Sequence, residues 1–102
     1  MELAKESVKG KRVKNNNVLI TAGASGIGKS IAEKFFQNQY KVWIVDKDQK
    51  ALDRCPDEWE KTKLDVSEED KVNELFLNIK VKWGSLDVLC ANAGIKGPTK
   101  PI

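Results

Sequence analysis

Two kinds of segment alternate along this chain. Short, nearly continuous apolar runs occupy residues 18–21, 40–45 and 86–91, and a weaker run occupies residues 60–64. Apolar runs of this length, bounded by glycine or polar residues, are typical of strands that are buried on both faces. The pattern therefore predicts four strands.

Between these runs, apolar residues recur at helical spacing. A helix is expected from Gly26, with one apolar face made of Ile27, Ile31, Ala32, Phe35 and Phe36. A longer helix is expected from an N-cap at Ser67 to a left-handed C-cap at Gly84, with its apolar positions at Val72, Leu75, Phe76, Ile79 and Trp83. The polar residues 47–55 could hold a short helix before Pro56. Alternating strands and helices imply right-handed crossovers, so we expect an α/β fold with a parallel sheet of about four strands flanked by helices.

A glycine-rich segment, TAGASGIG at residues 21–28, joins the first strand to the first helix. Glycines at such a junction let backbone N–H groups and a helix amino end approach a phosphate closely, although a tight turn without a ligand would use the same residues. Gly23, Gly28, Lys29 and Ser30 also fit the P-loop pattern, in which the lysine reaches the phosphates and the serine holds magnesium. Asp46, about twenty residues further on, favours a dinucleotide because an acid there accepts hydrogen bonds from the adenine ribose.

These motifs, together with Leu64-Asp65-Val66 and the segment DVLCANAG at residues 87–94, resemble the short-chain dehydrogenase/reductase family. The resemblance implies a Rossmann-type fold, an oxidoreductase acting on an alcohol/carbonyl pair, and NAD(P) as cofactor. By position it implies that the glycine loop contacts the pyrophosphate, Asp46 the ribose, Asp65 and Val66 the adenine, and the ANAG step the middle of the cofactor. The implied cofactor-binding residues are Gly23, Ser25, Gly26, Ile27, Gly28, Asp46, Asp65, Val66, Asn92, Ala93 and Gly94.

Two positions depart from the family pattern. Ala22 stands where the first glycine is usual, and Ala91 replaces the first asparagine of the ANAG step. Because a Cβ atom makes positive φ costly, we expect an ordinary φ at Ala22, with Gly23 supplying any unusual turn.

The proton donor of the family is a tyrosine with a lysine four residues later. The only tyrosine here is Tyr40, and Ile44 stands four residues after it, so we expect no catalytic residue in this chain. We expect residues 1–15 to form a basic, flexible tail, and residues 16–102 to form the N-terminal part of an NAD(P)-binding Rossmann domain, truncated before its catalytic half. An inactive cofactor-binding portion is the preferred interpretation. A stand-alone nucleotide-binding or interaction module and a P-loop ATP/GTP-binding fragment are the alternatives.

The amino-acid composition excludes some kinds of catalytic and metal site. The 102 residues contain no histidine and two cysteines, Cys55 and Cys90, without metal-site spacing, so neither a metal site nor a histidine triad is expected. Trp43 and Trp83 are expected in the core and Trp59 in a polar linker.

The net charge of +3 arises within the first fourteen residues, which lack interleaved aromatics, so no specific nucleic-acid partner is expected. No secretory signal or membrane-length apolar run occurs, which predicts a cytoplasmic protein without a membrane partner.

The expected partner is the dinucleotide itself. NAD is preferred to NADP because the carboxylate of Asp46 would repel a 2′-phosphate, although Lys47 softens that preference. The fourth strand would leave an apolar edge, which predicts self-association.

Overall fold

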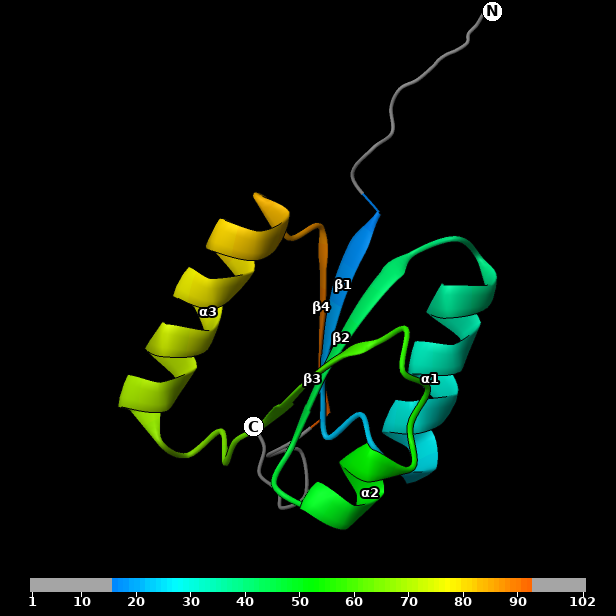
Figure 1. Ribbon diagram of the computed structural model, residues 1–102, viewed down its shortest axis with the longest axis horizontal. Helices are drawn as coiled ribbons and strands as arrows, with labels where there is room; N and C mark the ends of the chain where they lie inside the picture. Colours follow the sequence, from blue (N-terminus) through cyan, green and yellow to red (C-terminus); the bar gives the residue numbers. More distant parts are fainter. Residues whose placement is uncertain (1–15, 93–102) are drawn as a thin grey trace, which may run out of the picture.

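The structure, a computed structural model, describes residues 16–92, in which strands and helices alternate (Figure 1). The elements are β1 (Asn17–Thr21), α1 (Gly26–Gln37), β2 (Lys41–Asp46), α2 (Gln49–Asp53), β3 (Glu60–Lys63), α3 (Glu69–Trp83) and β4 (Val88–Ala91). All four expected strands and all three expected helices are confirmed, with ends that differ by no more than two residues. The predicted tail, Ala93 and Gly94 lie outside the described residues.

The four strands form one parallel sheet in the order β3-β2-β1-β4. Helices α1 and α2 lie against one face of the sheet and α3 against the other, which makes three layers (Figure 1). The chain leaves β1 toward β2 on one side and returns to β4 on the other. Strand order therefore reverses between β1 and β4, and the gap outside the carboxyl ends of such strands is where α/β sheets hold ligands.

A hydrophobic core lies on each face of the sheet. On the α1 and α2 face, Val18, Ile20 and Ile44 pack with Ala32 and Leu52. On the α3 face the buried residues are Leu19, Trp43, Val45, Leu64, Leu75 and Ile79. The strands contribute alternate residues to the two cores, which explains why their sequences read as continuous apolar runs.

The expected burial is wrong for four residues. Trp59 is not a linker residue: it is 3% exposed and packs edge-to-face on Phe36, with 6.3 Å between ring centroids. Conversely, Ile27 is 77% exposed, and Phe36 and Phe76 are each 40% exposed. The register of α1 buries Gly28 and Ala32 instead, so the apolar face of this helix is narrower than its sequence suggests.

The amino end of α3 also differs from expectation. The N-cap is Glu68, without a side-chain capping bond, and not Ser67. The Ser67 N–H and hydroxyl both donate to Asp65 Oδ1, at 2.9 and 2.8 Å, so this serine belongs to a turn before the helix. The left-handed C-cap at Gly84 is confirmed, with φ of 82°.

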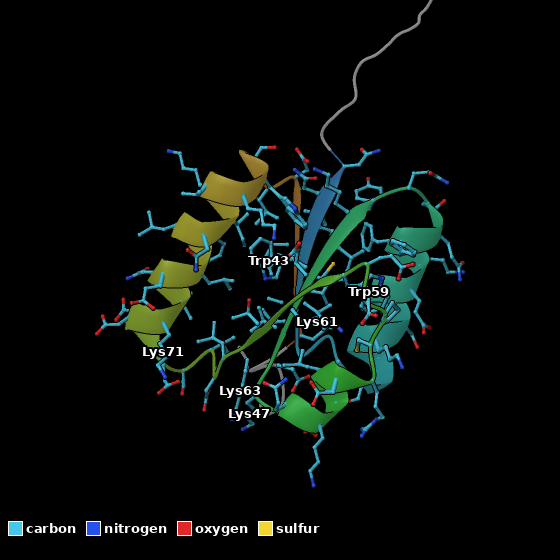
Figure 2. All side chains as sticks on the ribbon, in the orientation of Figure 1. Trp43, Lys47, Trp59, Lys61, Lys63 and Lys71 are labelled. Atoms are coloured by element: carbon cyan, nitrogen blue, oxygen red, sulfur yellow. The ribbon has the colours of Figure 1, made fainter. Side chains whose placement is uncertain are left out.

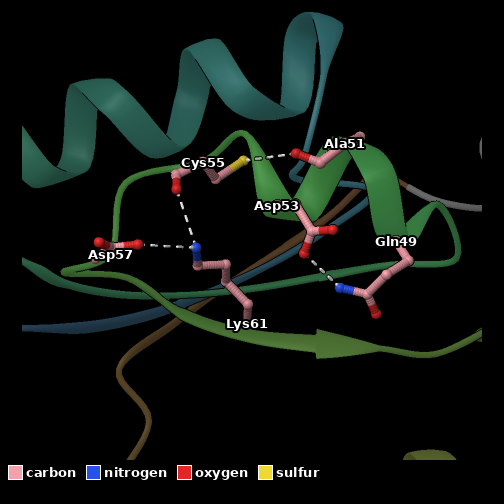
Figure 3. Close-up of polar contacts among 6 residues, drawn as sticks. All are labelled: Gln49, Ala51, Asp53, Cys55, Asp57 and Lys61. Carbon is pink, nitrogen blue, oxygen red and sulfur yellow. Dashed lines mark hydrogen bonds and ion pairs between the residues drawn. The ribbon is translucent and has the colours of Figure 1, made fainter.

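Polar contacts tie the loop after α2 to β3 (Figure 3). Lys61 Nζ on β3 donates to the Cys55 carbonyl at 2.9 Å and lies 3.8 Å from Asp57 Oδ1. The Cys55 thiol is buried and lies 3.4 Å from the Ala51 carbonyl oxygen, to which it donates, and 3.6 Å from that of Ala24. Cys55 is thus a packing residue between α2 and the loop that follows β1.

Candidate functional site

The loop from Ala22 to Ser25 lies at the carboxyl end of β1 and is held against β2. The Gly23 N–H donates to the Val45 carbonyl at 3.2 Å. Ala22 has a φ of 55°, whereas Gly23 is not among the residues with positive φ. The expectation of an ordinary φ at Ala22 is therefore wrong: the alanine itself makes the turn, and its Cβ atom costs about 1–2 kcal/mol there.

Two of the three glycines in the segment TAGASGIG are required by close packing. A Cβ atom at Gly28 would lie 2.0 Å from the Ala22 carbonyl oxygen, and one at Gly23 would lie 2.7 Å from Ile44 Cγ2. The first turn of α1 is therefore in direct contact with the loop backbone. Gly26 differs, because its φ is 59° and nothing lies within 4 Å of a Cβ atom built there. Its glycine serves backbone conformation and leaves open space beside the helix end.

The amino end of α1 is open to solvent. Ser25 caps it with an extended backbone and makes no side-chain capping bond, and the first turn contains no acidic residue. Ser25, Gly26 and Ile27 are all exposed. The first N–H groups of a helix have no partner within the helix and carry partial positive charge, so this end is suited to an anion.

Asp46 ends β2 and fixes the loop. Its Oδ2 accepts a hydrogen bond from the Ala24 N–H at 3.2 Å, and its Oδ1 accepts one from the Asp48 N–H at 3.1 Å. A carboxylate offers about four acceptor positions, so Asp46 retains capacity to accept further bonds. The bond to Ala24, which sequence reasoning missed, makes Asp46 a structural residue of the glycine loop as well as a candidate ribose contact.

The remaining candidates follow the other strands. Asp65 comes after β3 and accepts two bonds from Ser67, and Val66 packs against the core on the α3 face. Asn92 comes directly after β4, and its Nδ2 is buried without a hydrogen-bond partner. Such an orphaned donor costs about 1–3 kcal/mol unless a ligand or water satisfies it.

Parallel pairing brings these strand ends to one edge of the sheet. Thr21 is the register partner of both Val45 and Ala91, and Asp46 is the partner of Lys63. The glycine loop, Asp46 and Asn92 therefore border the same edge, at the reversal of strand order between β1 and β4. Lys63 is at this edge too, and sequence reasoning missed it. The alternation of Lys61 and Lys63 along a weak strand was the available signal.

Other chemistry is sparse among residues 16–92. Tyr40 precedes β2 at the opposite edge of the sheet and packs edge-to-face on Phe35. The described part of the chain holds no cluster of three residues able to ligate a metal, and no helix in it has the length and hydropathy needed to span a membrane. Burial raises the pKa of the Cys55 thiol, which keeps it protonated and unreactive. The cytoplasmic location stays a prediction.

An open helix end, a glycine loop and an acid on the neighbouring strand, at the reversal point of a parallel sheet, define a Rossmann-type nucleotide-binding unit. The short chain dehydrogenase family matches residues 16–102. The chain belongs to this family, which confirms the resemblance and the Rossmann-type fold.

Curated relatives support this family membership. The chain is 34% identical over 92 residues to 3beta-hydroxysteroid dehydrogenase of Mediterraneibacter gnavus, covering 83% of this chain and 33% of the relative. It is 37% identical over 97 residues to secoisolariciresinol dehydrogenase of Forsythia intermedia, covering 89% and 35%. The chain thus spans about a third of the length of these relatives.

Solved structures show the same fold. A variant of ElxO with NADPH bound is 40% identical, with a TM-score of 0.73, over 80% of this chain and 36% of that one. Aldohexose dehydrogenase of Thermoplasma acidophilum, in ligand-free form, is 30% identical, with a TM-score of 0.70, over 80% and 31%. These relatives are dehydrogenases or bind a nicotinamide dinucleotide, which favours that interpretation of the glycine loop over a P-loop.

Proposed function

We propose that this chain binds the adenosine and pyrophosphate portion of a nicotinamide dinucleotide, as the cofactor-binding part of an oxidoreductase that acts on an alcohol/carbonyl pair. The observation that carries the proposal is the unshielded amino end of α1, with open space at Gly26. The orphaned Asn92 Nδ2 at the same sheet edge also fits a polar ligand.

Each candidate residue has a distinct part in this proposal. The backbone N–H groups of Ser25, Gly26 and Ile27 would hold the pyrophosphate, because their partial charges complement its negative charge. Gly23 and Gly28 would act indirectly, by allowing the loop and helix to pack closely enough to present those groups.

Other residues would orient the rest of the cofactor. Asp46 would accept bonds from the ribose, and Asp65 and Val66 would border the adenine. The ANAG step, Asn92 with Ala93 and Gly94, would line the middle of the cofactor. When bound, the dinucleotide supplies hydride transfer.

We propose NAD as the preferred cofactor, because the Asp46 carboxylate opposes a second phosphate on the ribose. The NADPH-bound relative supports a nicotinamide dinucleotide without deciding between the two. We assign no catalytic role to Tyr40, which lies at the wrong edge of the sheet. We propose that residues 16–102 are the N-terminal part of a longer dehydrogenase domain. The alternative proposal is a stand-alone nucleotide-binding module.

A substitution at Ile27 separates binding from folding. Ile27 is exposed in the first turn of α1, where a carboxylate stabilises a helix by about 0.3–1 kcal/mol. Ile27→Asp should therefore keep or raise the melting temperature of the free protein while weakening NAD binding at least tenfold in calorimetric titration. Ile27→Asn is the neutral control and should retain most of the affinity. Equal NAD affinities for Ile27→Asp and Ile27→Asn would show that the amino end of α1 does not take part in NAD binding.

The P-loop alternative has its own test. Lys29→Ala removes the lysine that a P-loop needs, so it should leave NAD affinity within about twofold. Asp46→Ala should weaken NAD more than NADP, with some loss of stability because Ala24 loses its acceptor. Loss of NAD binding in Lys29→Ala with retention in Asp46→Ala would favour a P-loop over a dinucleotide site.

A further inference from the structure

Lys63 shares its place in the sheet with Asp46. The two residues are register partners on β3 and β2, and the Leu64 N–H donates to the Asp46 carbonyl at 3.0 Å. Register partners in a parallel sheet project to the same face. The Asp46 side chain reaches Ala24 on the α1 and α2 face, and Lys61, two residues before Lys63, reaches the Cys55 carbonyl on that face. Lys63 therefore extends from the sheet on the same side as the Asp46 carboxylate.

The lysine is free to act on a ligand. Lys63 is exposed, and no hydrogen bond or ion pair within residues 16–92 involves its ammonium group. Figure 2 shows Lys63 and Lys47 at the same end of the molecule, where β2 and β3 end. Lys61 is not free, since its Nζ is bonded to the Cys55 carbonyl at 2.9 Å.

The ends of β2 and β3 carry positive as well as negative charge. Each oxygen of the Asp46 carboxylate already accepts a backbone N–H, and these two donors stabilise its negative charge. Lys63, the register partner of Asp46, and Lys47, the next residue in the chain, place two positive charges at the same end of the sheet. A phosphate monoester carries about −1.5 to −2 charges at neutral pH. Its attraction to the two lysines would therefore offset its repulsion by the Asp46 carboxylate.

From this placement we propose that Lys63 is a specificity-determining residue that lets the site accept a dinucleotide with a 2′-phosphate, so that NADP binds alongside NAD. The inference rests on the proposed dinucleotide-binding function. It assigns the two residues opposite effects: Asp46 favours the free ribose hydroxyls, and Lys63 narrows that preference. Lys63 has the firmer position of the two lysines, because strand pairing fixes its backbone whereas Lys47 follows the last paired residue of β2.

Calorimetric titration with NAD and with NADP tests this proposal on the whole chain. Lys63→Gln should weaken NADP about three- to tenfold and change NAD less than twofold. Lys63→Arg should restore NADP affinity to within about twofold of the original protein. Lys71→Gln is the control, because Lys71 is also exposed but lies in the first turn of α3, on the other face of the sheet (Figure 2). It should change neither affinity.

The outcomes separate the two proposals. Equal effects of Lys63→Gln on NAD and NADP, or no effect on either, would overturn the role of Lys63 while leaving dinucleotide binding intact. Failure of the original protein to bind either nucleotide would overturn the proposed function itself. If Lys63→Gln does not fold, salt provides the second measurement. The NADP affinity of the original protein should fall more steeply with ionic strength than its NAD affinity, and equal slopes would count against the proposal.

Discussion

Gly28→Ala tests whether close contact between α1 and the glycine loop organises the site. The added Cβ atom would lie 2.0 Å from the Ala22 carbonyl oxygen, whereas such contacts are essentially never shorter than 3.0 Å. The helix or the loop must therefore move by about 1 Å or more. The loop is held by Gly23 on the Val45 carbonyl and by Ala24 on Asp46, so it cannot retreat without losing hydrogen bonds.

The expected cost follows from these contacts. Overpacking costs about 1–3 kcal/mol, and one lost hydrogen bond adds about 1 kcal/mol. Alanine recovers about 1 kcal/mol through its higher helix propensity. The net destabilisation should be about 1–3 kcal/mol, which lowers the melting temperature of a domain of this size by roughly 4–8 °C for each kcal/mol.

Urea unfolding followed by the fluorescence of the buried Trp43 and Trp59 measures the free energy of unfolding. Gly26→Asn is the matched control, because Gly26 has positive φ but open space, and asparagine tolerates the left-handed region. It should cost less than about 1 kcal/mol. A Gly28→Ala protein within 0.5 kcal/mol of the original, or one more stable than Gly26→Asn, would refute the packing argument.

Three further predictions concern other parts of the structure. Ala22→Gly should raise the free energy of unfolding by about 0.5–1 kcal/mol, because it relieves the strain of φ at 55° at the cost of some backbone entropy; a destabilised variant in the same urea assay would show that the alanine methyl matters more. Burial raises the pKa of Cys55 above the ordinary value of 9.0, so the folded state binds this proton more tightly than the unfolded state, and stability should fall as pH rises above about 9. A Cys55→Ala variant should lose that component of the pH dependence, and an unchanged slope would assign it to other groups. Because β4 is an edge strand and Leu89 on it is 51% exposed, we expect the chain to self-associate in analytical ultracentrifugation and Leu89→Lys to shift it toward monomer; a monodisperse monomer of the original sequence would contradict this.

The strands were predictable because their burial is encoded locally. Strands packed on both faces need apolar residues at successive positions, and the interiors of β1 and β2 have them. The edge strand β3 lacks such a run, yet its place in the chain was recognisable. Parallel pairing then follows from the helical crossovers, and it brings Asp46 and Asn92 to the end of the sheet where the glycine loop lies.

What the sequence did not reveal depends on contacts between distant residues. Ala22 has a positive φ, and the first turn of α1 packs on its carbonyl through Gly28, a contact that no local propensity describes. Ser67 has the composition of an N-cap, but Asp65 competes for its N–H and hydroxyl. Trp59 stands among polar neighbours and is nevertheless buried, because the loop after α2 folds back onto Phe36. Local patterns thus predicted which residues border the candidate site but not the backbone geometry within it.

Calorimetric titration of the chain with NAD, NADP and magnesium-ATP tests most directly whether a dinucleotide binds at the amino end of α1. Saturable binding of NAD, weakened by Ile27→Asp and retained in Ile27→Asn, is the predicted result. At about 100 times the Kd, such binding should stabilise the fold by about 2.7 kcal/mol, measurable as a higher melting temperature. Binding of magnesium-ATP with no response to NAD or NADP would contradict the account.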